Sequence, residues 1–278
     1  MPVILGINAG SYTDAQSVVP GLSGCRSYRD TVITSAADVP TVFPGQDGAK
    51  NTVSIRPHPD YFLTTGPHYD PAIEVAISAM IDDGCTRFGV PGLAPQLSSW
   101  HEAGNLLVGQ YSLTPQHVRS VHVKMQNLVN TVNANHPNAG VGYGPIWYGP
   151  ITGDPNGDCV DYFPTSTYPM DWYGIDVYWN TQFDLSTLTK IDTYLTPFKT
   201  VAQGLSGIPS PKIIVPECNT HLESNRPQYF KNLANWLSTN NGRRMMTFFK
   251  AGGNSGGAWD PTDQPTIDAL NYVVANYG

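Results

Sequence analysis

The chain has 278 residues, of which 40% are hydrophobic and 13% charged, and its formal net charge is −7. This length suits one α/β barrel, for which about 250 residues is typical, and the apolar content is sufficient for a large core. An acidic chain without clustered Lys and Arg is unsuited to nucleic acid, because phosphate binding depends on such clusters. The sequence contains no run of about 18 apolar residues, so it predicts no membrane span.

The first half of the chain alternates apolar, β-like runs with helical patterns. Its strands are predicted over residues 3–7, 25–29, 52–56 and 97–100. Asp70 and Pro71 form a typical helix start, an N-cap followed by Pro at the first helical position, and Gly84 is the predicted end of that helix. A longer helix is predicted from Thr114-Pro115 to about residue 136, with an apolar stripe at helical spacing.

The second half continues the same alternation. Its strands are predicted over residues 140–147, 171–179, 212–215 and 245–249, and its helices over 185–195, 229–237 and 267–277. Strands that are apolar throughout are typical of a buried parallel sheet. Eight strands in a chain of this length therefore predict a single (β/α)8 TIM barrel, an α/β fold that occupies residues 1–278 as one domain.

Two carboxylates follow predicted strands. Glu102 comes directly after strand four and Glu217 after strand seven. In a TIM barrel the carboxyl ends of the strands carry the active site, so the two side chains are expected to converge on one substrate. Glycoside cleavage needs such a pair, in which one carboxylic acid protonates the leaving oxygen. The second carboxylate attacks the anomeric carbon when the carboxyls lie about 5–5.5 Å apart, which gives retention; about 6.5–9.5 Å implies inversion.

Three segments carry a resemblance to known enzymes, and they are Trp100-His101-Glu102-Ala103-Gly104-Asn105, Gly174-Ile175-Asp176-Val177-Tyr178 and Val215-Pro216-Glu217. The first resembles the acid/base motif of glycoside hydrolase family 26, in which His precedes the catalytic Glu on strand four. The other two resemble strands six and seven of clan A glycoside hydrolases. Trp259 is similar to the aromatic residue of the strand-eight loop that floors the innermost sugar subsite.

This resemblance covers about residues 50–260, and it implies a retaining hydrolase of a β-linked polysaccharide. Glu102 is then the acid/base and Glu217 the nucleophile, and Tyr178 hydrogen-bonds the nucleophile. Mannan, xylan, mixed-linked glucan and an actinobacterial wall glycan all remain open as substrates. Aromatic-rich loops favour a cleft and endo action.

Several other residues are expected to support the pair. An arginine near the nucleophile would keep it ionised, and Arg56 and Arg26 are the candidates. Trp100 is expected to form an apolar wall beside the acid/base, and His101 to bind substrate or fix the loop. The remaining candidates for substrate contact follow predicted strands, and they are Asn8, His58, Asp60, Trp147 and Trp179.

Other interpretations of these residues stay open. The two glutamates could be ordinary rim carboxylates in ion pairs, and the protein a catalytically inactive barrel that binds carbohydrate. His58, Asp60, His68 and His101 could be imagined as the ligands of a metal-dependent hydrolase, although they lack the spacing of a helical zinc site. Cys218 with His221 as a thiol nucleophile is the least favoured. No cofactor or metal is expected.

The sequence says less about partners and location. Four cysteines, Cys25, Cys85, Cys159 and Cys218, match no zinc pattern, and buried free thiols are favoured over two disulfides. A poly- or oligosaccharide is the expected partner of a monomer, with no nucleic acid and no membrane. The start of the chain shows no leader pattern, which leaves a cytoplasmic protein, or a secreted one whose leader has been removed, as expectations.

Overall fold

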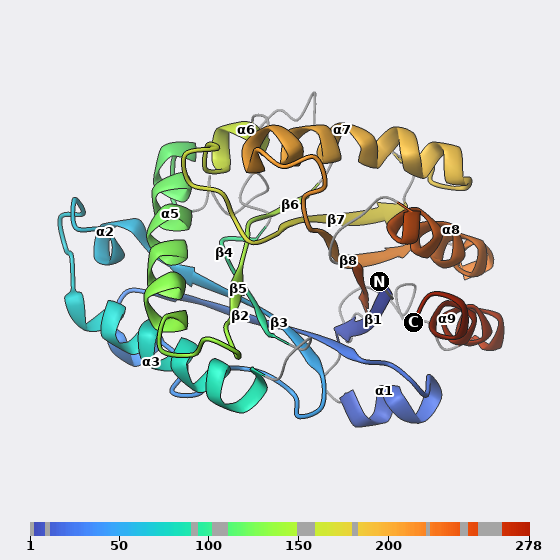
Figure 1. Cartoon of the computed structure of the whole chain (residues 1–278), viewed down its shortest axis with the longest axis horizontal. Coiled ribbons are helices and arrows are strands. Elements are labelled where there is room, and N and C mark those ends of the chain that lie inside the picture. Colours follow the sequence, from blue (N-terminus) through green and yellow to red (C-terminus); the bar gives the residue numbers. More distant parts are fainter. Residues whose placement is uncertain are drawn as a thin grey trace. The chain divides into compact units, whose positions relative to one another are not determined.

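The computed structural model describes residues 3–8, 12–89, 94–101, 111–148, 159–179, 183–220, 223–239, 244–249 and 263–278 (Figure 1). The chain divides into two compact units. The first unit comprises Met1–Arg26, Tyr173–Gly204 and Ile208–Gly278, and the second comprises Ser27–Trp172 with Leu205–Gly207. The single-domain organisation stays a prediction.

The described residues contain nine strands. They are β1 (Val3–Asn8), β2 (Gly24–Ile33), β3 (Lys50–Pro57), β4 (Gln96–Ser99), β5 (Gly142–Tyr143), β6 (Ile146–Tyr148), β7 (Tyr173–Trp179), β8 (Ile213–Thr220) and β9 (Arg244–Phe249). The larger helices are α1 (Tyr12–Val18), α3 (Pro71–Phe88), α5 (Pro115–Asn133), α7 (Leu188–Ser206), α8 (Arg226–Thr239) and α9 (Gln264–Tyr277). The short ones are η1 (Ala36–Asp38), α2 (Pro59–Phe62), α6 (Cys159–Tyr162) and η2 (Glu223–Asn225).

The first unit is a parallel sheet covered by helices. Its strand order is β7-β8-β9-β1, followed by the first residues of β2. Helix α9 packs on β1 and on α8, and α8 packs on β8 and β9 (Figure 1). The strand interiors are almost wholly buried, which agrees with the uninterrupted apolar runs of the sequence, because a parallel sheet of this type is covered on both faces.

The second unit has the same plan. Its strands lie in the order β2-β3-β4-β5, and β3, β4 and β5 pair in parallel. Helices α3 and α5 pack on each other, and α5 also contacts β4 and β5 (Figure 1). The apolar stripe of α5 is buried as the periodicity predicts, including Val118, Val121 and Met125.

The two helix starts predicted from N-cap residues are confirmed. The Asp70 carboxylate accepts a hydrogen bond from the Ala72 amide at 2.9 Å, and Pro71 occupies the first helical position of α3. The Thr114 hydroxyl likewise accepts from the His117 amide at 3.2 Å at the start of α5. These caps satisfy amides that have no partner inside the helix, so they define where each helix begins.

The predicted helix end at Gly84 is wrong. Helix α3 continues to Phe88 and is capped by Gly89, and Gly84 lies buried inside it. A Cβ atom at Gly84 would lie 2.6 Å from the Phe43 ring. The glycine is thus required by the close approach of Phe43, a long-range contact, and it does not end the helix.

The predicted fifth strand, residues 140–147, is two short strands. Strands β5 and β6 are separated by Gly144 and Pro145. Pro145 has no amide to donate, and Gly144 is closely approached by the backbone of Trp172, whose oxygen would lie 2.1 Å from an added Cβ. The Gly144 amide still donates to the Leu97 carbonyl at 3.1 Å, and the strand ladder is interrupted at Pro145.

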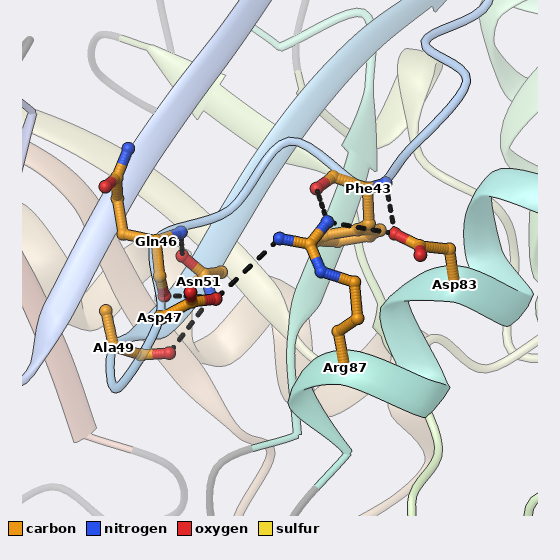
Figure 2. A network of polar contacts seen from close by, with 7 residues as sticks. All are labelled: Phe43, Gln46, Asp47, Ala49, Asn51, Asp83 and Arg87. Carbon is orange, nitrogen blue, oxygen red and sulfur yellow. Dashed lines mark hydrogen bonds and ion pairs between the residues drawn. The ribbon is translucent and has the colours of Figure 1, made fainter.

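Polar contacts fasten the segment before β3 to α3 (Figure 2). Arg87 donates to the Phe43 carbonyl at 3.4 Å and to the Asp83 carboxylate at 3.1 Å, and it pairs with Asp47 at 3.7 Å. Asn51, at the start of β3, accepts from the Gln46 amide at 2.8 Å. These contacts fix the entry of the strand that carries Arg56.

Two further findings concern the hydropathy of the helices and the state of the cysteines. None of the described helices is both long and apolar enough to cross a membrane. Cys25, Cys85 and Cys218 are buried thiols, as expected; the side chain of Cys159 lies outside the described residues.

Candidate active site

Glu217 lies inside strand β8 and not in the loop after it, because the strand continues to Thr220. Between Val215 and Cys218, β8 contains one more residue than the paired stretches of β7 and β9. This β-bulge coincides with Pro216, which cannot donate to a ladder, and bulges re-aim side chains next to functional sites. The predicted strand end at Val215 is therefore wrong, and the bulge is what sets the direction of the Glu217 side chain.

Glu217 is 5% exposed, and two side chains of the same unit, Tyr178 and Arg26, act on its carboxyl. Tyr178, on β7, donates its hydroxyl hydrogen bond to Glu217 Oε2. Burial raises the pKa of Glu217 to about 7, and the positive charge of Arg26 acts in the opposite direction. The hydrogen bond predicted for Tyr178 is confirmed, and Arg26 is the arginine whose charge acts on this carboxyl.

The strand register explains why Arg26 is near Glu217. Ile7 of β1 pairs with Cys25, so Arg26 is level with Asn8 at the carboxyl end of the first unit's sheet. On the other side of β1, Ile7 pairs with Phe248, which in turn pairs with Cys218. Adjacent parallel strands therefore bring residues far apart in the sequence to one edge. Asn8 ends β1, but its side chain lies outside the described residues.

The second unit carries the residues that precede the predicted acid/base. Ser99 pairs with Ile55, which places Trp100 level with Arg56 at the carboxyl ends of β4 and β3. Trp100 is fully buried and has φ 47, a left-handed backbone that is costly for a bulky residue. Its indole donates to the Pro57 carbonyl at 2.6 Å and its amide donates to the Ile55 carbonyl at 3.1 Å. These two bonds hold the strained residue in place.

The two histidines predicted to contact substrate occupy different surroundings. His101 is nearly buried, and its ring centre lies 4.9 Å from that of Tyr28. His58 caps helix α2 by accepting from the Asp60 amide at 3.3 Å. Burial lowers the pKa of His58, so its neutral form is favoured. Their roles toward a substrate stay predictions.

Two of the tryptophans predicted to stack on sugars, Trp147 and Trp179, pack against other aromatic side chains of the protein. Trp147 is fully buried, with its ring centre 5.4 Å from that of Tyr162 and 6.2 Å from that of Phe163. Trp179 is nearly buried and meets Tyr229 edge to face at 6.2 Å. Both rings contact aromatic side chains of the protein, and a role in sugar stacking stays a prediction.

Two of the predicted site residues lie outside the described part of the chain. These are Glu102, the predicted acid/base, and Trp259, the predicted floor of the sugar subsite. Within the described residues, no group of three or more His, Cys, Asp or Glu is placed to hold a metal ion.

Sequence reasoning missed a buried polar cluster next to Trp100. Ser99 Oγ lies 3.3 Å from His122 Nδ1, and the Tyr143 hydroxyl lies 2.8 Å from the same nitrogen. Tyr143 and Ser99 also hydrogen-bond each other. Burial lowers the pKa of His122 to about 3, so its ring is neutral. The three residues come from β4, α5 and β5, and no local pattern relates them.

The arrangement around Glu217 can perform acid/base or nucleophilic chemistry near neutral pH. A buried carboxyl with a pKa near 7 exchanges its proton in the working range of most enzymes. When it is ionised, the Tyr178 hydroxyl orients its Oε2 atom. The nearby positive charge of Arg26 favours that ionised form.

Known proteins resemble this chain in structure but not in sequence. No protein-family model matches it, and no curated protein matches its sequence. The catalytic domain of a family 26 endo-β-1,4-mannanase from Bacillus sp. JAMB-750 has a TM-score of 0.59 at 13% identity, covering 99% of this chain and 86% of that one.

Two further solved structures are similar. A broad-specificity family 5 endoglucanase from Ruminococcus champanellensis, with bound cellotriose, has a TM-score of 0.54 at 15% identity and covers 97% of this chain and 96% of that one. A family 128 oligosaccharide-binding protein from Cryptococcus neoformans has a TM-score of 0.55 at 11% identity and covers 100% of this chain and 95% of that one.

These similarities define the class of fold. The chain has the (β/α)8-barrel fold found in the clan A glycoside hydrolases, which confirms the fold class predicted from the alternating strands and helices. The resemblance to that clan, inferred from three short segments, is confirmed as a likeness in structure.

Proposed function

We propose that the protein is a retaining glycoside hydrolase that cleaves a β-linked polysaccharide by double displacement. Glu217 acts as the nucleophile and Glu102 as the acid/base. The single observation that carries this proposal is the buried Glu217 carboxyl at the β8 bulge, held by the Tyr178 hydroxyl and influenced by Arg26.

In the first step Glu217 attacks the anomeric carbon while Glu102 protonates the departing oxygen. In the second, Glu102 takes a proton from water, and that water releases the sugar from Glu217 with the original configuration. Endo action is favoured, because structural neighbours include an endo-β-1,4-mannanase and an endoglucanase.

The second candidate function is carbohydrate binding without turnover. It is favoured by one observation, because a neighbour of the same fold is described as an oligosaccharide-binding protein. The two functions share a sugar-binding barrel and differ in whether bonds are broken, so activity of the wild type separates them.

The test is reducing-end release from mannan, xylan, mixed-linked glucan, β-1,3-glucan and cellulose. The wild type is expected to degrade at least one of them. Glu217→Gln and Glu102→Gln are each expected to lower kcat by about 10³-fold or more, since each removes a group that reacts in the transition state. Asp82→Asn, an equivalent change on helix α3, is the matched control and is expected to retain activity.

Retention is checked separately by following the anomeric configuration of the first product by NMR. Release of the β-anomer before mutarotation supports double displacement, and release of the α-anomer would assign an inverting mechanism instead. Equal degradation by the wild type and both Gln variants would show that the residues are wrongly assigned.

A further inference from the structure

A cavity of about 570 Å³ lies in the second unit, between the end of α2, helix α5 and the segment after α6. This volume is within the range of sites that hold small ligands. None of its lining residues belongs to the predicted catalytic set. Its walls are formed by α5 and by the segments that follow α2 and α6, and α5 contacts both of these short helices.

The wall formed by α5 is the face of the helix opposite the core. Gln116, Ser120, Val123 and Asn127 line the cavity and recur three or four residues apart, so they share one side of the helix. The core residues of α5, such as Val121, lie on the other side. Amide and hydroxyl groups are therefore presented to the cavity.

The two cations of the cavity are already paired with acceptors of the protein. Arg119 donates to the Val160 carbonyl at 3.2 Å and to the Asp161 carbonyl at 2.5 Å. Lys124 donates to the Phe62 carbonyl at 2.6 Å and forms an ion pair with Glu74. Because both cationic side chains already bind acceptors of the protein, the cavity is better suited to a neutral polar ligand than to an anion.

Tyr168 places a half-exposed aromatic ring at the cavity. Its side chain is 47% exposed, and among the described residues its ring and hydroxyl have no hydrogen-bond or ring partner. A turn in which the Tyr168 amide donates to the Thr165 carbonyl at 2.9 Å holds its backbone. A half-exposed ring with no ring partner among the described residues, beside amides and hydroxyls, matches the alternating apolar and hydroxyl surface of a sugar.

We propose that this cavity is a second carbohydrate-binding site, which holds a neutral saccharide by stacking on Tyr168 and hydrogen bonding to Gln116 and Asn127. The proposal rests on the proposed function, because it assigns the same class of ligand. Such a site would retain the protein on a polysaccharide while the catalytic centre works on another part of it, and it raises the effective concentration of substrate.

Binding is tested in the Glu217→Gln background, so that turnover does not remove the ligand. Depletion isotherms are measured with insoluble β-1,4-mannan, β-1,3-glucan and cellulose. Tyr168→Ala is expected to lower the association constant about fivefold to tenfold, and Tyr168→Phe to retain most of it, because the ring is kept. Tyr272→Ala is the matched control, since Tyr272 is 42% exposed on α9 in the other unit.

Kinetics in the wild-type background distinguish a polysaccharide site from a site for free oligosaccharides. Tyr168→Ala is expected to slow degradation of the insoluble polymer severalfold and to leave kcat/KM for a soluble oligosaccharide unchanged. The proposal is overturned if Tyr168→Ala and Tyr272→Ala bind alike, or if the Glu217→Gln protein binds none of the three polymers. If the wild type releases no reducing ends but Tyr168→Ala still weakens binding, the proposed catalytic function fails and the site stands.

Discussion

At the scale of single residues, Glu217 shows a conflict between burial and charge. Burial favours the neutral carboxyl, whereas Arg26 and the Tyr178 hydroxyl favour the carboxylate. A group that served only the fold would be more stable as an uncharged residue of the same shape. The protein therefore carries at this position a cost that packing does not explain, which agrees with the catalytic role proposed for Glu217.

This conflict predicts how Glu217→Gln changes stability with pH. The folded pKa of Glu217 is raised to about 7, so the wild type loses stability as pH rises from about 4.5 through 7, and the glutamine variant does not. The free energy of unfolding of Glu217→Gln relative to the wild type should increase by up to about 3 kcal/mol between pH 4 and pH 8.5. Urea unfolding at several pH values measures it.

Asp184→Asn is the comparison for this experiment. The hydrogen bond from Lys190 lowers the pKa of Asp184 to about 2. Asparagine at this position is therefore expected to lose stability relative to the wild type as pH rises from about 2 to about 4, which is the opposite direction, and to show no further change between about pH 4 and 8.5. A pH-independent difference for Glu217→Gln would contradict the assigned burial of the charge.

At the scale of elements, the end of β8 is held by a buried arginine. Arg226, at the start of α8, is fully buried; its Nε donates to the Thr220 carbonyl at 3.2 Å and its guanidinium lies 3.5 Å from the Asp263 carboxylate. Asp263 caps α9 by accepting from the Thr266 amide at 2.9 Å. The Arg226 side chain thus connects the end of β8, the strand that carries Glu217, with the starts of α8 and α9.

Removing this arginine should be costly. Arg226→Met keeps the apolar stem but leaves Thr220 and Asp263 without the donor, and we expect a loss of about 3 kcal/mol in the free energy of unfolding. Arg87→Met is the matched control, because Arg87 pairs at the surface, where ion pairs contribute about 0–1 kcal/mol. Urea unfolding of both variants tests the contrast, and equal losses would refute it.

At the scale of the whole molecule, the buried cluster of Ser99, His122 and Tyr143 joins two strands and a helix that are separate in the sequence. Burial lowers the pKa of His122 to about 3 and raises that of Tyr143, so both groups are neutral in the folded protein. Protonation of the unfolded chain therefore acts against folding in acid.

The resulting prediction concerns acid unfolding. Below about pH 6.5 the unfolded chain binds a proton at His122 and the folded one does not, so stability falls as pH decreases toward 3, by up to about 5 kcal/mol from this residue. His122→Gln removes the ionisable ring and should flatten this part of the stability profile, followed by circular dichroism. A variant profile as steep as that of the wild type would contradict the assignment.

What the sequence determined by itself was local or periodic. Asp70 and Thr114 marked the starts of helices because a cap acts on amides only two or three residues away. The alternation of apolar strands and amphipathic helices predicted the barrel, because each pattern has its own period. The hydrogen bond between Tyr178 and Glu217 was expected from the order of the motifs, and it is present.

Only the tertiary structure decided the features that depend on contacts between distant residues. Gly84 reads as a helix end but is required by the approach of Phe43. The bulge at Pro216 and the pairing of His122 with Ser99 and Tyr143 arise from how strands and helices meet. The sequence favoured Arg56 over Arg26 as the arginine near Glu217, whereas it is the charge of Arg26 that lowers the pKa of this carboxyl. Strand register places Arg26 at the same sheet edge, and Coulomb interaction depends on distance in space.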